Sequence, residues 1–295
     1  MTGKPLFDTI TFIGIGLIGS SLARVIRRDN LAKRIVACAR SDATLDKVME
    51  LGLADHVTKD VQEAARGADL IILCTPISTC GPLAEAMAPV LKPGQIVSDV
   101  GSVKQAVIAA VAPHMPEGVH FVPGHPIAGT ENSGPESGFD NLFVGRRFIV
   151  TPTDDTDEAA IERVSELWRR AGSTIDRMSP EHHDWVLALT SHLPTLIAFN
   201  IVGTVDDLES STKQEVIKYS ASGFRDLTRL AAQDPVMWRD VFLNNREAVL
   251  EMLQRFSEDL SRLQRAIRWG EAEALEDLIR RSRDIRRNVI EAGQA

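Results

Sequence analysis

The stretch ITFIGIGLIGSSLARVIRR, residues 10–28, decides the fold. Its apolar start predicts a buried strand, a turn of the form GxGxxG follows at once, and an amphipathic run then predicts a helix. This order is typical of the dinucleotide-binding fingerprint, in which glycines allow a tight turn and a close approach to a pyrophosphate, while the helix N-terminus faces the phosphates. The alternative is a plain glycine-rich turn. The expected cofactor contacts are Gly14, Gly16, Leu17, Ile18 and Gly19.

The end of the second predicted strand, residues 34–39, indicates which dinucleotide is bound. In units that bind NAD, an acidic residue closes this strand about 20 residues after the glycines and binds the ribose hydroxyls. Ala39 stands there instead, and Arg40 and Ser41 follow, a cation and a hydroxyl that suit a 2′-phosphate. The sequence therefore favours NADP and leaves NAD as the alternative. Arg40 could equally be a solvated loop residue.

Composition and charge are those of a soluble globular protein. The chain has 295 residues, of which 44% are hydrophobic and 25% charged, so one large domain or two ordinary ones are expected. The net charge of −8 argues against nucleic acid or an anionic membrane as the main partner. The start of the chain lacks a signal-peptide pattern, and His192 and Pro194 interrupt the most apolar long run, residues 186–203. We expect a cytoplasmic protein with no membrane span and no metal site.

Strands and helices alternate along the first part of the chain. Further strands are predicted at residues 68–74, 95–100, 119–123, 147–151 and 174–178, with helical runs between them. This alternation predicts an α/β fold with a Rossmann-type, doubly wound and mostly parallel sheet. From Ser179 and Pro180, a plausible helix start, the pattern is helical to the end. We therefore expect a dinucleotide-binding domain over residues 1–178 and an all-helical substrate and dimerisation domain over residues 179–295.

Four polar or glycine-rich positions follow predicted strands directly: Gly14, Thr75, Ser102 and His125. Ligands of doubly wound sheets bind at the carboxyl ends of the strands, so these residues should converge. Thr75 and Pro76 are accordingly expected to contact the cofactor.

His125 is the candidate general base. It follows a strand and lies in GHPIAGTE, residues 124–131, where glycine and proline fix the backbone. An imidazole there can accept a proton near neutral pH. Ser102 could orient this imidazole or bind the same hydroxyl, or it could simply cap the helix expected to start near Val103. A lone histidine is more often structural, but the strand end and the nearby fingerprint favour catalysis here.

Two features of the helical half also indicate function. Asp226 and Arg229 share a helix face, either as a surface ion pair or with Arg229 as the fork for a substrate carboxylate. A continuous apolar stripe from Trp238 to Leu263 predicts one long helix over about residues 235–269. A helix of that length, roughly 50 Å, exceeds what this small region can cover, so we expect a homodimer built through it.

Five motifs occur in the order GxGxIGxS, DVGSVK, GHPIAGTE, SHLP and GFRDLTR. In this order they resemble the TyrA family of prephenate, arogenate and cyclohexadienyl dehydrogenases, over nearly the whole chain. The resemblance implies oxidative decarboxylation of prephenate, arogenate or both in tyrosine biosynthesis, with hydride transfer to NAD(P). It also implies that the two halves leave no room for a further mutase or regulatory segment.

The resemblance assigns roles residue by residue. His125 matches the catalytic histidine that accepts the proton of the ring hydroxyl, and Ser102 the serine that hydrogen-bonds with it. Arg229 matches the arginine that binds the side-chain carboxylate. The remaining matches line the substrate pocket: Glu131, Asp226 and His192. Thr195 departs from the family, because many members have a second substrate-binding histidine there.

Two other classes of protein stay open at this stage. A dehydrogenase of the β-hydroxyacid type would rely on a catalytic lysine in its helical half, for which Lys213 and Lys218 are available without a recognisable motif. A dinucleotide-binding regulatory protein would not need His125, Ser102 and Arg229 to converge. The sequence leaves open the choice between prephenate and arogenate, the cofactor ratio and inhibition by tyrosine.

Overall fold

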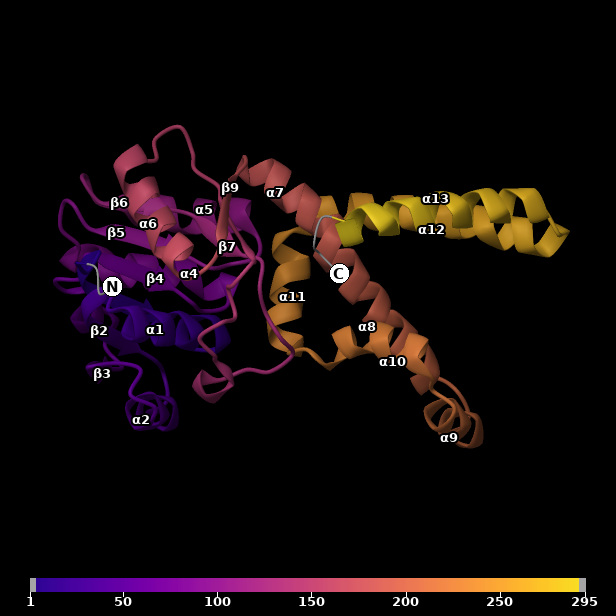
Figure 1. Ribbon diagram of the computed structural model, residues 1–295, viewed down its shortest axis with the longest axis horizontal. Coiled ribbons are helices and arrows are strands. Elements are labelled where there is room, and N and C mark those ends of the chain that lie inside the picture. The colour runs from indigo at the N-terminus through magenta and orange to yellow at the C-terminus, as the bar shows by residue number, and fades with distance from the viewer. Residues whose placement is uncertain (1–3, 292–295) are drawn as a thin grey trace. The chain divides into compact units, whose positions relative to one another are not determined.

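The computed structural model describes residues 4–291, apart from the side chain at position 211. The chain divides into two compact units after Arg246, and each is described separately below. The first unit holds two sheets and the helices up to α11 (Figure 1).

A six-stranded parallel sheet forms the centre of the first unit, in the order β3-β2-β1-β4-β5-β6. This is the doubly wound arrangement that the alternation of elements predicts. The chain moves outward from β1 to β3, then returns to the other side of β1 for β4 to β6. The strands are β1 (Phe7–Ile13), β2 (Ala32–Cys38), β3 (His56–Thr58), β4 (Leu70–Leu73), β5 (Ile96–Asp99) and β6 (His120–Val122).

Both faces of this sheet are covered, which explains why the inner strand β4, with the sequence LIIL, is apolar throughout. Along β1, Ile10 and Phe12 face one hydrophobic cluster and Ile13 faces the other. The first cluster includes side chains of α1 (Leu17–Asp29), α2 (Asp42–Glu50) and α6 (Glu158–Arg170). The second includes side chains of α3 (Val61–Ala65), α4 (Ile77–Met87) and α5 (Lys104–Val111).

The last three strands form a sheet of their own, so the expectation of a single doubly wound sheet is wrong for them. β7 (Gly124–Pro126) runs antiparallel to β8 (Arg147–Val150), which runs parallel to β9 (Thr174–Arg177). The change of sheet occurs at Pro123, which has no N–H to donate to a ladder. This break separates β7, the strand that carries His125, from β6.

The helical part of the first unit begins as expected, because the Ser179 hydroxyl accepts the His182 N–H and caps α7 (Pro180–Leu187). A π-helical turn over Ala188–His192 joins α7 to α8 (Leu193–Asp206). The combined helix, Pro180–Asp206, is long and apolar enough to cross a membrane by length and composition alone, a test that core helices of soluble proteins also pass. It is followed by α9 (Ser210–Lys218), α10 (Ser222–Thr228) and α11 (Pro235–Asn244).

The predicted single helix over residues 235–269 is wrong, because the chain breaks at Asn245. This residue ends α11 with φ −107° and ψ 35°, and its side chain bonds to other elements. A new helix, α12 (Arg246–Trp269), starts after it. The second unit then turns at Gly270, whose φ of +67° favours glycine, and continues as α13 (Ala272–Glu291). All regular elements described after residue 179 are helical.

Candidate active site

The glycine turn has the geometry that a dinucleotide requires. Gly14 has φ +81°, and a Cβ on it would lie 2.6 Å from Thr75 Cγ2 and 2.8 Å from the Cys74 carbonyl oxygen, so only glycine fits. A Cβ on Gly16 would meet no atom of residues 4–291 within 4 Å, which leaves open space over the backbone at this point. A Cβ on Gly19 would lie 3.3 Å from the Gly14 carbonyl oxygen, so helix and turn pack closely.

The start of α1 faces this open space with free donors. Leu17 and Ile18 are its first two residues, and no side chain in the described part of the chain caps them. Beside the turn, Thr75 Oγ1 is buried and lacks a hydrogen-bond partner in the described part of the chain. A buried hydroxyl without a partner is costly, and a bound ligand would satisfy it. The turn, the helix end and Thr75 therefore fit a dinucleotide, and Pro76 lies next to them at the start of α4.

The loop after β2 is accessible. Arg40 is exposed, with no hydrogen bond to any residue that the structure describes. Ser41 caps α2, because its hydroxyl accepts the Thr44 N–H at 3.2 Å. Arg40 is thus available to a ligand, while Ser41 has a structural bond as well.

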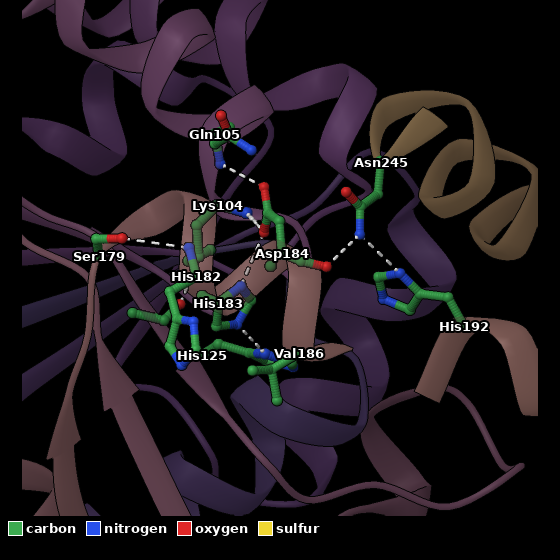
Figure 2. A network of polar contacts seen from close by, with 12 residues as sticks. Lys104, Gln105, His125, Ser179, His182, His183, Asp184, Val186, His192 and Asn245 are labelled. Carbon is green, nitrogen blue, oxygen red and sulfur yellow. Dashed lines mark hydrogen bonds and ion pairs between the residues drawn. The ribbon is translucent and has the colours of Figure 1, made fainter. Parts of the chain in front are cut away.

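His125 belongs to a row of three side chains. Its Nδ1 lies 2.9 Å from His183 Nε2, and His183 Nδ1 lies 2.8 Å from Asp184 Oδ1. Figure 2 shows the row, with His183 between Asp184 and His125. His183 and Asp184 are buried, whereas His125 is half-buried at the edge of the second sheet.

The protonation states along this row follow from hydrogen-bonding rules. Burial would raise the pKa of Asp184, but hydrogen bonds from His183 and from backbone N–H groups outweigh it and lower the pKa, so Asp184 is a carboxylate that only accepts. His183 Nδ1 therefore carries a proton. Burial lowers the pKa of His183, so the ring is neutral and its Nε2 accepts from His125 Nδ1–H. The lone pair of His125 is left on Nε2.

Burial also lowers the pKa of His125 well below its ordinary value, and nearby His183, Lys104 and His192 add to this effect. The imidazole is consequently unprotonated at neutral pH. A neutral ring with a free Nε2 lone pair is the state that a general base requires.

Asp184 also fixes the start of α5. Its carboxylate accepts the N–H of Lys104 at 2.7 Å and the N–H of Gln105 at 2.9 Å. These are N–H groups of the first helical turn, which an anion satisfies well. Ser102 is therefore not the N-cap of this helix, because Val103 holds that position and Asp184 supplies the acceptor.

Ser102 does not orient His125 in this structure. It is partly buried and makes no side-chain hydrogen bond with the residues described. The hydrogen-bond partner of His125 Nδ1 is His183 instead. The Ser102 hydroxyl therefore remains available to a substrate, and its catalytic role stays a prediction.

A buried ion pair holds the backbone before His125. Lys104 Nζ donates to the Asp99 carboxylate and to the Gly124 carbonyl oxygen, the latter at 2.7 Å. Asp99 in turn accepts the Gly124 N–H at 3.1 Å. A Cβ on Gly124 would run into the Phe148 ring. Both peptide groups of Gly124 are thus fixed, and with them the place of His125.

His192 is fully buried at the end of the π-helical turn. Its Nδ1 lies 3.0 Å from Asn245 Nδ2, and its Nε2 is buried without a hydrogen-bond partner among the described residues. Burial lowers the pKa of His192 to about 4. Thr195 is buried one turn further on, and its hydroxyl donates to the Ser191 carbonyl oxygen at 3.0 Å.

Arg229 approaches Glu131 rather than Asp226. The shortest distance, from Arg229 Nη1 to Glu131 Oε2, is 3.5 Å, and both side chains are substantially exposed. Two of the predicted substrate residues are thereby brought together. Asp226 is exposed on α10 and forms no ion pair with any described residue. The alternative of an Asp226–Arg229 surface ion pair is thus not observed.

Sequence reasoning missed four residues of this site: His183, Asp184, Lys104 and Asn245. His182 and His183 are both in the first turn of a predicted helix, where exposure is the ordinary expectation. Only His182 is exposed, whereas His183 is buried. One signal in the sequence could have indicated that these two residues are buried. The His-Asp pair at 183–184 lies one residue before the apolar run over residues 186–203.

Two family models match the chain. The model described as prephenate dehydrogenase, nucleotide-binding domain, matches residues 22–176. The model described as prephenate dehydrogenase, dimerization domain, matches residues 179–281.

Individual proteins and structures agree with these models. A cyclohexadienyl dehydrogenase of Zymomonas mobilis is 44% identical over 89% of this chain and 89% of its own length. A crystal structure of prephenate dehydrogenase from A. aeolicus, in complex with hydroxyphenyl propionate and NAD+, has a TM-score of 0.87 and 34% identity, and the match covers 96% of this chain and 98% of that one. The Synechocystis arogenate dehydrogenase has a TM-score of 0.79 and 30% identity, with 95% and 99% covered.

Proposed function

The chain belongs to the prephenate dehydrogenase family, and from this premise we propose that it oxidatively decarboxylates prephenate, arogenate or both in tyrosine biosynthesis. The resemblance inferred from the five sequence motifs is thereby confirmed, and the chain is a dehydrogenase that uses a nicotinamide dinucleotide. The two rival classes are not favoured. Of the lysines that a β-hydroxyacid dehydrogenase would need, Lys213 pairs with Asp206 and Lys218 lies over the Tyr219 ring.

The observation that carries the mechanism is the row from Asp184 through His183 to His125. It leaves the Nε2 lone pair of a neutral His125 free to accept the proton of the substrate's ring hydroxyl. His183 and Asp184 act as positioning residues, because they fix the tautomer of His125 that has its lone pair on Nε2. The hydroxyl carbon becomes a ketone carbon, and the bond between the ring and its carboxylate then breaks. The electron pair of that bond moves through the ring to the ketone oxygen, so carbon dioxide leaves and the ring becomes aromatic.

A bound nicotinamide dinucleotide supplies the acceptor for the hydride that leaves the hydroxyl carbon. Gly14, Gly16 and the free N–H groups of Leu17 and Ile18 would hold its pyrophosphate, and Thr75 and Pro76 would contact it beside the turn. Gly19 contributes close packing of α1. These are the residues of the chain whose geometry suits the cofactor.

Substrate binding is assigned to the helical part of the first unit and to the segments that follow β5 and β7. Arg229 would exchange its long contact with Glu131 for the side-chain carboxylate, which a guanidinium binds through two parallel hydrogen bonds. His192 would bind the substrate as well, while Ser102, Glu131, Asp226 and Thr195 would line the pocket. Because Thr195 replaces the second histidine, the preference between the side chains of prephenate and arogenate is measured by the assay described below.

We further propose that NADP is the preferred cofactor and NAD the weaker one. Ala39 offers no carboxylate to the ribose hydroxyls, and the exposed Arg40, with Ser41 beside it, can pair with a 2′-phosphate. The protein is proposed to act in the cytoplasm as a homodimer, with a boundary between the dinucleotide-binding and helical halves at residues 178 and 179.

Absorbance at the wavelength of reduced nicotinamide tests this function. Prephenate and arogenate are each supplied with NAD+ and with NADP+, and released carbon dioxide is measured in parallel. We expect equal amounts of reduced cofactor and carbon dioxide with at least one substrate, and faster turnover with NADP+. No turnover of either substrate would refute the proposed dehydrogenase function. Faster turnover with NAD+ would refute only the NADP preference inferred from Arg40.

A further inference from the structure

We propose that Asn245 is a positioning residue, which fixes His192 in its Nε2–H form so that the substrate site presents a hydrogen-bond donor to an acceptor oxygen of the substrate. This inference rests on the proposed function, because it names the chemistry of one contact in that site. No sequence motif points to Asn245, which lies at the break between α11 and α12.

The orientation of the Asn245 amide follows from its partners. A single atom, Nδ2, lies 2.8 Å from the Asp184 carbonyl oxygen and 3.0 Å from His192 Nδ1. A carbonyl oxygen can only accept, so the NH₂ end of the amide, and not its oxygen, faces both groups. Figure 2 shows the two dashed lines diverging from this nitrogen to Asp184 and to His192.

The tautomer of His192 follows in turn. One hydrogen of the Asn245 NH₂ group points at His192 Nδ1, so Nδ1 must offer a lone pair. In a neutral imidazole the proton is then on Nε2. Asn245 is itself buried, so water cannot readily take over either bond.

The Nε2–H group is left as a buried donor without a partner among the described residues. Such a group destabilises a folded protein unless a ligand or water supplies an acceptor. The ring also lies close to the catalytic row, since the Asn245 amide that bonds His192 Nδ1 also bonds the carbonyl oxygen of Asp184. The Trp238 ring meets it edge-on, at 6.0 Å between centroids.

Thr195, the next predicted substrate residue along the chain from His192, does not supply this donor. The Thr195 hydroxyl donates its hydrogen bond to the Ser191 carbonyl oxygen. Toward a ligand it can therefore only accept. A neutral donor at His192 suits a carboxylate or carbonyl oxygen and excludes a donor group such as an ammonium at the same place. Asn245 thus determines which chemical group of the substrate can lie against His192.

The tautomer can be measured without any change to the chain. Nitrogen-15 NMR of the holoenzyme with labelled histidine distinguishes Nε2–H from Nδ1–H rings, and the His192 signals are assigned by their loss in His192→Gln. We expect the Nε2–H form of His192. The Nδ1–H form would overturn the inference.

Kinetics test the consequence. In Asn245→Asp the carboxylate accepts a proton from Nδ1, so the tautomer reverses and Nε2 becomes an acceptor. We expect KM for the substrate to rise about ten- to a hundredfold, the loss typical of one hydrogen bond to a charged group, with kcat changed much less. Asn244→Asp is the matched control, because the exposed Asn244 side chain bonds, among the described residues, only to the Asp240 carbonyl oxygen. The KM of this variant should stay unchanged.

The outcomes separate this inference from the proposed function. An unchanged KM and tautomer in folded Asn245→Asp would overturn the role of Asn245 while leaving the role of His125 intact. If Asn245→Asp does not fold, the NMR measurement on the unsubstituted enzyme decides the question alone. Inactivity of the unsubstituted enzyme toward both substrates would instead refute the function.

Discussion

His125 has its lone pair on Nε2 because His183, its hydrogen-bond partner, has its own proton on Nδ1. Asp184 keeps a proton on His183 Nδ1, and this leaves His183 Nε2 as the acceptor for His125 Nδ1–H. The general base is therefore set by three residues from two parts of the chain, β7 and α7. The sequence predicts the first of them, and only the fold reveals the other two.

The pH dependence of turnover follows from the lowered pKa of His125. The residue acts as a base only when it is unprotonated, so activity is lost as the pH falls through its pKa. Because burial moves this pKa well below the ordinary value of about 6.5, kcat/KM should stay level as the pH falls through 6.5 and decline only in more acidic solution. A decline centred at pH 6.5 or above would show that His125 is not in the environment described.

Removal of His183 should slow the chemical step. In His183→Phe the His125 tautomer is no longer fixed, so kcat should fall by about ten- to a thousandfold, and the acid limb of the pH profile should move to higher pH. The dissociation constant of the cofactor should not change. His182→Gln is the control, since this neighbour is exposed and outside the row. Equal effects of the two substitutions would contradict the positioning role.

At the scale of elements, α5 depends on contacts that are distant in sequence. Asp184 satisfies its first N–H groups from 80 residues away, and Lys104 in its first turn pairs with Asp99 and holds Gly124. Helix, catalytic strand and α7 are therefore fixed to one another through a few buried polar groups. Buried networks of this kind are costly to break, since every member depends on the others.

Lys104→Met tests this network. The substitution leaves the Asp99 carboxylate buried without its cation, which typically costs about 3–5 kcal/mol in the free energy of unfolding. Urea denaturation of the substituted and unsubstituted chains measures the difference. Lys92→Met, at an exposed position after α4, should change stability by less than about 0.5 kcal/mol. If Lys104→Met lowers the free energy of unfolding as little as Lys92→Met does, the proposed role of Lys104 in fixing Asp99 and Gly124 is wrong.

Elements were predictable from the sequence where local pattern decides them. The doubly wound, parallel central sheet and the helical character of the second half are both confirmed. The separate sheet of β7, β8 and β9 was not predictable, because periodicity shows that a segment is a strand and not which strand it pairs with. The break at Asn245 escaped for a similar reason, since the bonds that stabilise it come from residues 53 and 61 positions away.

At the scale of the whole molecule, the second unit leaves much apolar surface exposed. In α12 and α13 the large exposed side chains include Ile267, Trp269, Ile279 and Ile285. A groove of about 570 Å³ runs between these helices within the unit, with Leu263, Leu275 and Leu278 among its lining residues. Apolar surface of this extent on a charged helix pair is typical of a surface that is covered by another chain. This agrees with the match of residues 179–281 to a dimerisation domain.

Ile285→Glu should weaken the dimer. Ile285 lines the groove and is 64% exposed in a single chain, so a carboxylate there would be buried without a partner in the assembly. Light scattering should give twice the 32.3 kDa of one chain for the unsubstituted protein, and a mass close to one chain for the variant at micromolar concentration. Arg283→Glu introduces the same residue two positions away, about half a turn around α13, and should leave the mass unchanged. A monomeric unsubstituted protein would contradict the proposal.

The central claim is that His125 accepts the proton of the substrate's ring hydroxyl. Steady-state turnover of His125→Asn, with prephenate or arogenate and saturating dinucleotide, tests it most directly. The side chain of asparagine can hydrogen-bond but cannot act as a base at neutral pH, so kcat should fall by roughly two to four powers of ten while the dissociation constant of the cofactor stays the same. Turnover close to that of the unsubstituted enzyme would contradict the account.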